Sequence, residues 1–124
     1  VAVGSGKLIW CPLPVELNDR VETVAELYRH AAEAAGIAAP LEWRKGGDEP
    51  GVYGRKLSFE QGHLFVFVSE AAWDAEIEIG DRDAGAAYAF KLEKERSVLF
   101  ATDRTGRVTA VYRPEEVEIR TFDF

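Results

Sequence analysis

Sulfur is nearly absent from this sequence. Its 124 residues include one cysteine and no methionine, so an internal disulfide bond is excluded. Cys11 lies within a run of apolar residues, and we therefore predict that it is a buried, unreactive thiol. Because the sequence has no initiating methionine and begins at Val1, we expect it to be a segment cut from a longer polypeptide.

Long apolar runs and an excess of basic residues are missing as well. No stretch of about 18 apolar residues could span a membrane, and no basic segment followed by an apolar one forms a leader. The 22 acidic and 15 basic residues give a net charge of −7, and an acidic surface repels the phosphates of nucleic acids. We therefore predict a cytoplasmic protein with neither nucleic acid nor a membrane as its partner.

Histidines are few, and no catalytic constellation is recognisable. The sequence has two histidines and contains no Cys-x-x-Cys pair and no Ser-His-acid order. His30 falls within a predicted helix, where a solvated side chain is the simplest interpretation, and His63 is expected at an exposed turn. The surroundings of His30 in the sequence do not favour a metal site. We predict no catalytic residues, no metal site and no cofactor.

Two groups of acidic residues are candidate sites. Asp81, Asp83 and Gly85 match the opening of a calcium loop, but its twelfth position, which should hold a bidentate glutamate, is Leu92. Glycosidase carboxylates must face each other across a cleft in unlike environments. Neighbouring loop residues, such as these aspartates or the glutamates at 115–116, do not provide that geometry. We expect no calcium binding and no glycosidase chemistry from them.

What the sequence does contain is organised around the segment Leu64–Val68, which is apolar without interruption. Successive side chains of a strand point to opposite faces, so both faces of this strand require apolar cover. A helix is predicted over Arg20–Ala35, with Asp19 as its N-cap and Gly36 as its left-handed C-cap. Its apolar residues recur at three- and four-residue spacing. We predict that this helix covers one face of the sheet that contains Leu64–Val68.

Segments of strand type recur at short, regular spacing from Leu41 onward. In residues 73–79, apolar side chains alternate with acidic ones, which indicates a half-buried strand with Trp73 in the core. Residues 52–59 form another strand, with Tyr53, Leu57 and Phe59 on one face. Residues 86–92 form a third, with Tyr88, Phe90 and Leu92 facing inward. Turns are predicted at 60–63 and 103–106.

The predicted fold class is therefore α+β: an N-terminal strand and one helix, followed by an antiparallel β-sandwich of about seven strands. We place a β-α unit at residues 1–40 and the sandwich domain at 41–124. The first strand, Leu8–Cys11, is apolar on both faces. If its neighbours belong to a removed part of a larger sheet, Leu8, Ile9 and Trp10 would drive self-association.

Exposed aromatic side chains are the remaining candidates for ligand binding. Trp43 flanks a glycine-rich loop, and Tyr53 lies on the strand that follows this loop. Two or more coplanar aromatic rings of this kind could stack on sugar rings. We therefore keep Trp43 and Tyr53 as candidate carbohydrate-binding residues.

Part of the sequence resembles a known family. The segment Gly6–Leu17, followed by Leu27–His30 and Ala34–Ile37, is similar to a region near the C-terminus of bacterial multidomain glycoside hydrolases of the β-galactosidase and cellulase type. In that family, a catalytic TIM barrel precedes an amidotransferase-like α/β domain and a small β-domain. The resemblance implies that residues 1–40 close the α/β domain and that Leu64–Glu70 opens the β-domain.

The same resemblance implies that the catalytic acids lie upstream and that upstream domains of the parent chain are the partners. No functional residue is carried over, because the matched positions are not the catalytic ones of the family. Glu16, the conspicuous polar residue of the match, is interpreted as a carboxylate at a helix entry. We predict a non-catalytic accessory domain of a glycoside hydrolase; the alternative is a carbohydrate-binding module that uses exposed aromatic residues.

Overall fold

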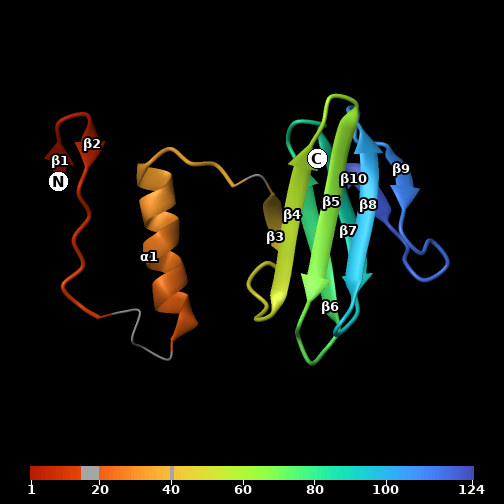
Figure 1. Cartoon of the computed structure of the whole chain (residues 1–124), viewed down its shortest axis with the longest axis horizontal. Helices are drawn as coiled ribbons and strands as arrows, with labels where there is room; N and C mark the ends of the chain where they lie inside the picture. Colours follow the sequence, from red (N-terminus) through yellow and green to blue (C-terminus); the bar gives the residue numbers. More distant parts are fainter. Residues whose placement is uncertain (15–19, 40) are drawn as a thin grey trace. The chain divides into compact units, whose positions relative to one another are not determined.

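The computed structural model of the chain describes residues 1–14, 20–39 and 41–124 (Figure 1). It divides into two compact units, Val1–Ala39 and Pro40–Phe124. Most of the regular structure is antiparallel β-sheet, accompanied by one helix, among the described residues. The prediction of a mainly antiparallel β fold with one helix is confirmed at this level.

The first unit begins with a small hairpin. Strands β1 (Ala2–Val3) and β2 (Gly6–Lys7) pair across a turn in which Gly4 has a φ of +60°, a backbone conformation that glycine adopts without strain. The hairpin ends at Val1 and Leu8, where the Leu8 N–H donates a 2.7 Å hydrogen bond to the Val1 carbonyl.

The strand predicted over Leu8–Cys11 is wrong. Residues 8–11 lie outside any strand, and every residue from 1 to 14 is exposed. Cys11 is therefore an exposed free thiol, not the buried thiol that its apolar neighbours predicted. The physical reason is that a strand needs a partner for its backbone groups, and the hairpin pairing ends at Leu8.

Helix α1 (Val21–Ala34) follows, close to its predicted bounds. Its end is a Schellman motif: the Gly36 N–H donates to the carbonyl of Glu33, and the Ile37 N–H donates to that of Ala32, with Gly36 at a φ of +70°. The predicted left-handed cap is thus confirmed, whereas Asp19 and Glu16 lie outside the described residues. No residue of α1 is buried, and its docking on a sheet stays a prediction.

The described residues of the second unit, 41–124, contain eight strands in two four-stranded sheets, and every pairing among them is antiparallel. One sheet has the order β10-β7-β6-β3, and the other has the order β4-β5-β8-β9. The strands are β3 (Glu42–Lys45), β4 (Val52–Ser58), β5 (Gly62–Ser69), β6 (Ala75–Asp81), β7 (Ala86–Leu92), β8 (Ser97–Asp103), β9 (Val108–Val111) and β10 (Arg120–Asp123).

An aromatic core joins the two sheets. Phe65 and Phe67 on β5 are fully buried, and they contact Tyr88 and Phe90 on β7, with ring centroids 5.3 Å apart for Phe65–Tyr88 and 4.8 Å apart for Phe67–Phe90. Phe100 on β8 stacks on Phe65 at 4.8 Å. Large apolar rings of this kind dominate the energetics of a core. The predicted bounds and inward face of β7 are confirmed.

The other side of the β4-β5-β8-β9 sheet carries apolar side chains that are only partly buried. We call this side the outer face; by the strand register it is formed by Tyr53, Arg55, Leu57, Leu64, Val66, Val68, Leu99 and Ala101. Val68 is 41% exposed and Tyr53 is 59% exposed. The central strand β5 is therefore fully covered on its Phe65–Phe67 side only.

Candidate functional site

The two predicted sugar-binding residues do not form one platform. The Trp43 ring packs edge-on against Phe67 with ring centroids 5.6 Å apart, and a Cβ added at Gly54 would lie 2.6 Å from this ring. Tyr53 is the neighbour of Gly54 on β4, so its side chain points to the opposite face of the strand. Trp43 thus packs onto the core, whereas Tyr53 lies on the outer face.

The other tryptophans are more exposed than the sequence pattern suggested. Trp73 is 51% exposed and donates a hydrogen bond of 3.2 Å to the Glu49 carboxylate. Its predicted place in the core is wrong, because β6 begins only at Ala75. Trp10 is 80% exposed.

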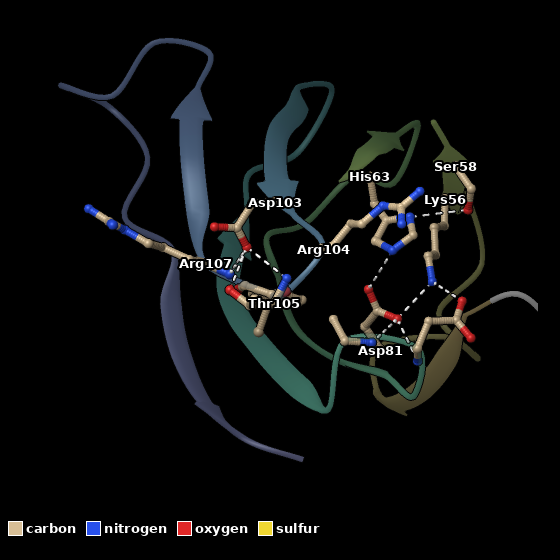
Figure 2. Close-up of polar contacts among 12 residues, drawn as sticks. Lys56, Ser58, His63, Asp81, Asp103, Arg104, Thr105 and Arg107 are labelled. Carbon is tan, nitrogen blue, oxygen red and sulfur yellow. Dashed lines mark hydrogen bonds and ion pairs between the residues drawn. The ribbon is translucent and has the colours of Figure 1, made fainter. Parts of the chain in front are cut away.

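The main polar cluster of the second unit is centred on Lys56. This side chain points inward from β4 and is 3% exposed. Its ammonium donates to Asp81 Oδ1 at 2.7 Å and to Asp83 Oδ2 at 2.6 Å (Figure 2). A buried ammonium requires such partners, because an uncompensated charge in an apolar interior is very costly. The lysine comes from one sheet. In the other sheet, Asp81 ends β6 and Asp83 lies in the β6–β7 connection.

Asp81 is the buried anchor of this connection. It is the last residue of β6, which therefore extends two residues beyond the strand predicted at 73–79. Its Oδ1 accepts hydrogen bonds from the backbone N–H groups of Asp83 at 3.1 Å and Ala84 at 3.4 Å. This Asx-type turn orders the loop, and Gly85 completes the loop with a φ of +66°.

His63 is the third member of the cluster, and its predicted exposure is wrong. The β4–β5 turn is closed by a 2.8 Å hydrogen bond from the Phe59 N–H to the Gly62 carbonyl, so His63 already belongs to β5 and lies on the same face as Phe65. Its side chain is 11% exposed. His63 Nδ1 lies 3.1 Å from Ser58 Oγ, and its Nε2 lies 3.9 Å from Asp81 Oδ2 (Figure 2).

Electrostatics favour the charged forms of Lys56 and Asp83. Burial by itself lowers the pKa of Lys56, but the hydrogen bonds to Asp81 and Asp83 outweigh this effect and raise the pKa above its ordinary value. The hydrogen bond from Lys56 lowers the pKa of Asp83. A carboxylate held ionised in this way is a poor proton donor at neutral pH, so Asp83 is unsuited to general-acid chemistry.

A second ordered turn lies beside the cluster, at the predicted position 103–106. Asp103 Oδ1 accepts hydrogen bonds from the N–H groups of Thr105 and Arg107 at 2.9 and 3.0 Å, and Gly106 has a φ of +84°. The hydroxyl of Tyr88 donates to the Gly106 carbonyl at 2.8 Å. Burial, followed by the charge of Asp81, raises the pKa of Tyr88 to about 12. The turn is thus tied to the core.

A pocket of about 260 Å³ is found elsewhere in the second unit, where the segment before β10 passes the ends of β7 and β8. Arg113 on this segment bonds to the Glu116 carboxylate at 3.2 Å and to the Ser97 carbonyl at 3.1 Å. Charges of both signs surround the pocket, including Arg96, Arg113, Arg120, Glu76, Glu116 and Glu118. This mixture indicates no particular class of ligand.

Sequence reasoning missed Lys56 and underrated His63. A signal for Lys56 was present: it is in phase with Val52 on β4, on the face opposite to Tyr53 and Leu57. This signal is weak, because the Tyr53 face of the strand is the more apolar of the two. His63 could have been placed on the inner face from its two-residue spacing to Phe65.

Comparisons of the sequence with protein-family models, with curated proteins and with solved structures give no match. Within the described residues, no helix is long and apolar enough to cross a membrane.

Proposed function

We propose that this chain is a non-catalytic accessory region of a glycoside hydrolase, in which residues 41–124 form a β-sandwich domain. The starting point is the resemblance of Gly6–Leu17 and the segments after it to the C-terminal region of these enzymes. The two facing sheets with their shared aromatic core are what a small β-sandwich requires.

The observation that carries the proposal is the pairing of one lysine with two aspartates. Asp81 and Asp83 are one of the two acidic pairs in the sequence, and glycoside hydrolysis needs one carboxyl group with a raised pKa. Instead, Lys56 binds both of them, and the pKa of Asp83 is lowered. These acids hold the two sheets together, which is the work of a structural domain.

The outer face adds a reason to expect a neighbouring domain. Tyr53, Leu57 and Val68 are 59%, 40% and 41% exposed and belong to one apolar sheet face. Contiguous apolar surface of this kind marks protein contacts. In this proposal its partner is an upstream domain of the same parent polypeptide, and the Arg55 guanidinium among these apolar residues would meet a carboxylate there.

Two experiments test the proposal. The purified chain is assayed against a panel of nitrophenyl glycosides, beside the variant Asp83→Asn. We expect no turnover, and hydrolysis that disappears in Asp83→Asn would contradict the non-catalytic role. The complete reading frame is then determined; the proposal requires a catalytic TIM-barrel domain upstream, and a frame without one would refute the accessory role.

A further inference from the structure

One buried oxygen of the Lys56 cluster is left without a partner. Asp81 Oδ2 accepts no hydrogen bond from the described residues, although the Asp81 side chain is fully buried. Buried carboxylate oxygens are nearly always bonded, and an unpartnered one calls for an explanation such as a bound ion. His63 Nε2 lies 3.9 Å from this oxygen, beyond hydrogen-bond distance.

The orientation of His63 makes this nitrogen a suitable ligand. Its Nδ1 lies 3.1 Å from Ser58 Oγ, which can accept the Nδ1 hydrogen. In that tautomer, Nε2 carries a lone pair directed toward Asp81 Oδ2, so two acceptors face each other. Metal-binding histidines are arranged in the same way: one ring nitrogen donates to a protein group, and the other binds the ion.

Asp83 supplies a third ligand at the protein surface. His63, Asp81 and Asp83 each offer one ligand atom, and these atoms all lie within 4.8 Å of one another. The Asp83 side chain is 74% exposed, which gives an ion a route from solvent to the buried carboxylate. Lys56 bonds to Asp81 Oδ1 and Asp83 Oδ2, so Asp81 Oδ2 and the other Asp83 oxygen remain for an ion.

We propose that His63, Asp81 and Asp83 form a binding site for a divalent ion of the zinc class. One imidazole nitrogen and two carboxylate oxygens suit zinc or cobalt, and three protein ligands leave a fourth position for water. Calcium takes six to eight oxygen ligands, which this cluster does not offer. The ion would join β5 of one sheet to the β6–β7 turn of the other.

The charges of the cluster are compatible with a dication. Lys56 carries one positive charge and the two aspartates carry two negative ones, so the cluster with neutral His63 has a net charge of −1. A bound zinc ion changes this net charge to +1. A hydroxide or chloride in the fourth position cancels that excess, because metal-bound water loses its proton readily.

The test is a titration of the full chain with zinc chloride alone, followed by thermal unfolding. We expect Tm to rise by about 5 °C when zinc is about tenfold above its dissociation constant. His63→Gln should abolish this rise, and His30→Gln, which changes the only other histidine of the sequence, should retain it. Calcium chloride at the same concentration should leave Tm unchanged. An equal rise in the wild type and His63→Gln would overturn the proposal, as would no rise at all.

Two further measurements do not depend on the folding of His63→Gln. Asp83→Asn alters an exposed side chain and should weaken zinc binding at least about tenfold. In the wild-type protein, zinc should shift the ring proton resonances of His63 and leave those of His30 in place. Zinc that shifts only the His30 resonances, or that binds Asp83→Asn as tightly as the wild type, would refute the site.

Discussion

Replacing Lys56 by methionine should destabilise the second unit severely. Methionine keeps most of the aliphatic stem but removes the ammonium, and with it the 2.7 Å bond to Asp81 Oδ1 and the 2.6 Å bond to Asp83 Oδ2. Breaking one side of a buried ion pair costs about 3–5 kcal/mol, because the remaining charge is buried without compensation. Asp81, whose side chain is fully buried, accounts for most of this loss.

Asp83 contributes little to the expected loss. Its side chain is 74% exposed, and exposed ion pairs are worth about 0–1 kcal/mol because water screens them. A loss of about 3–5 kcal/mol is a large part of the total stability of a small domain, which is about 5–15 kcal/mol. We therefore expect the urea midpoint, followed by far-UV circular dichroism at pH 7, to fall sharply.

Two further variants test whether the buried ion pair stabilises the fold. Lys91→Met is the matched control, since Lys91 pairs with Asp74 at 2.8 Å but is 52% exposed; it should cost at most about 1 kcal/mol. Adding Asp81→Asn to Lys56→Met should recover part of the lost stability, because the uncompensated charge is then gone. If Lys56→Met lies within about 0.5 kcal/mol of the wild type, or the double variant recovers nothing, the cluster does not stabilise the fold as argued.

The other predictions concern the core, one turn and the N-terminal segment. Tyr88→Phe should cost about 0.5–1.5 kcal/mol by leaving the Gly106 carbonyl unbonded. Because the folded state raises the pKa of Tyr88 to about 12, its contribution is complete below pH 10 and is lost as the pH rises toward 12; unfolding titrations of Tyr88→Phe should lack this component. Gly106→Ala should cost more than about 1 kcal/mol in thermal unfolding, since a Cβ at a φ of +84° would lie 2.5 Å from Ala86; an unchanged Tm would contradict this packing. Light scattering should detect self-association that Trp10→Glu abolishes, since Trp10 is 80% exposed; a wild-type chain that stays monomeric at high micromolar concentration would exclude it.

Two strands, one turn and the end of the helix show which features are predictable from the sequence. Strict alternation of apolar and acidic residues predicts β6, and large side chains at every second position predict β7. Both signals are local. The turn at 103–106 is equally local, because Asp103 and Gly106 define it by their own chemistry. Helix α1 ends where Gly36 predicts, since a C-cap depends only on neighbouring backbone groups.

The candidate site could not be predicted in the same way. Lys56 and Asp81 are 25 residues apart in the sequence and meet only because β4 and β6 belong to facing sheets. No spacing rule relates these two positions. The strand prediction for Leu8–Cys11 is wrong for the same reason. The apolar composition of this segment favours a strand, but a strand depends on a partner that lies elsewhere in the fold.

The position of β4 in its sheet has a consequence for aggregation. Among the described residues of the second unit, the strands at the sheet edges are β3, β4, β9 and β10. Three of these have four residues each, and β3 carries an irregularity at Trp43–Lys45, which makes them poor templates for another chain. β4 has seven residues and is the longest row of unpaired backbone groups.

An inward-pointing charge is one of the devices by which an edge strand resists a foreign strand. Lys56 provides such a charge in the middle of β4. Lys56, which holds the two sheets together, would therefore also discourage edge-to-edge association of this protein into fibres. Replacing Lys56 would remove this charge, and we expect a foreign strand to pair along β4 more readily in such a variant.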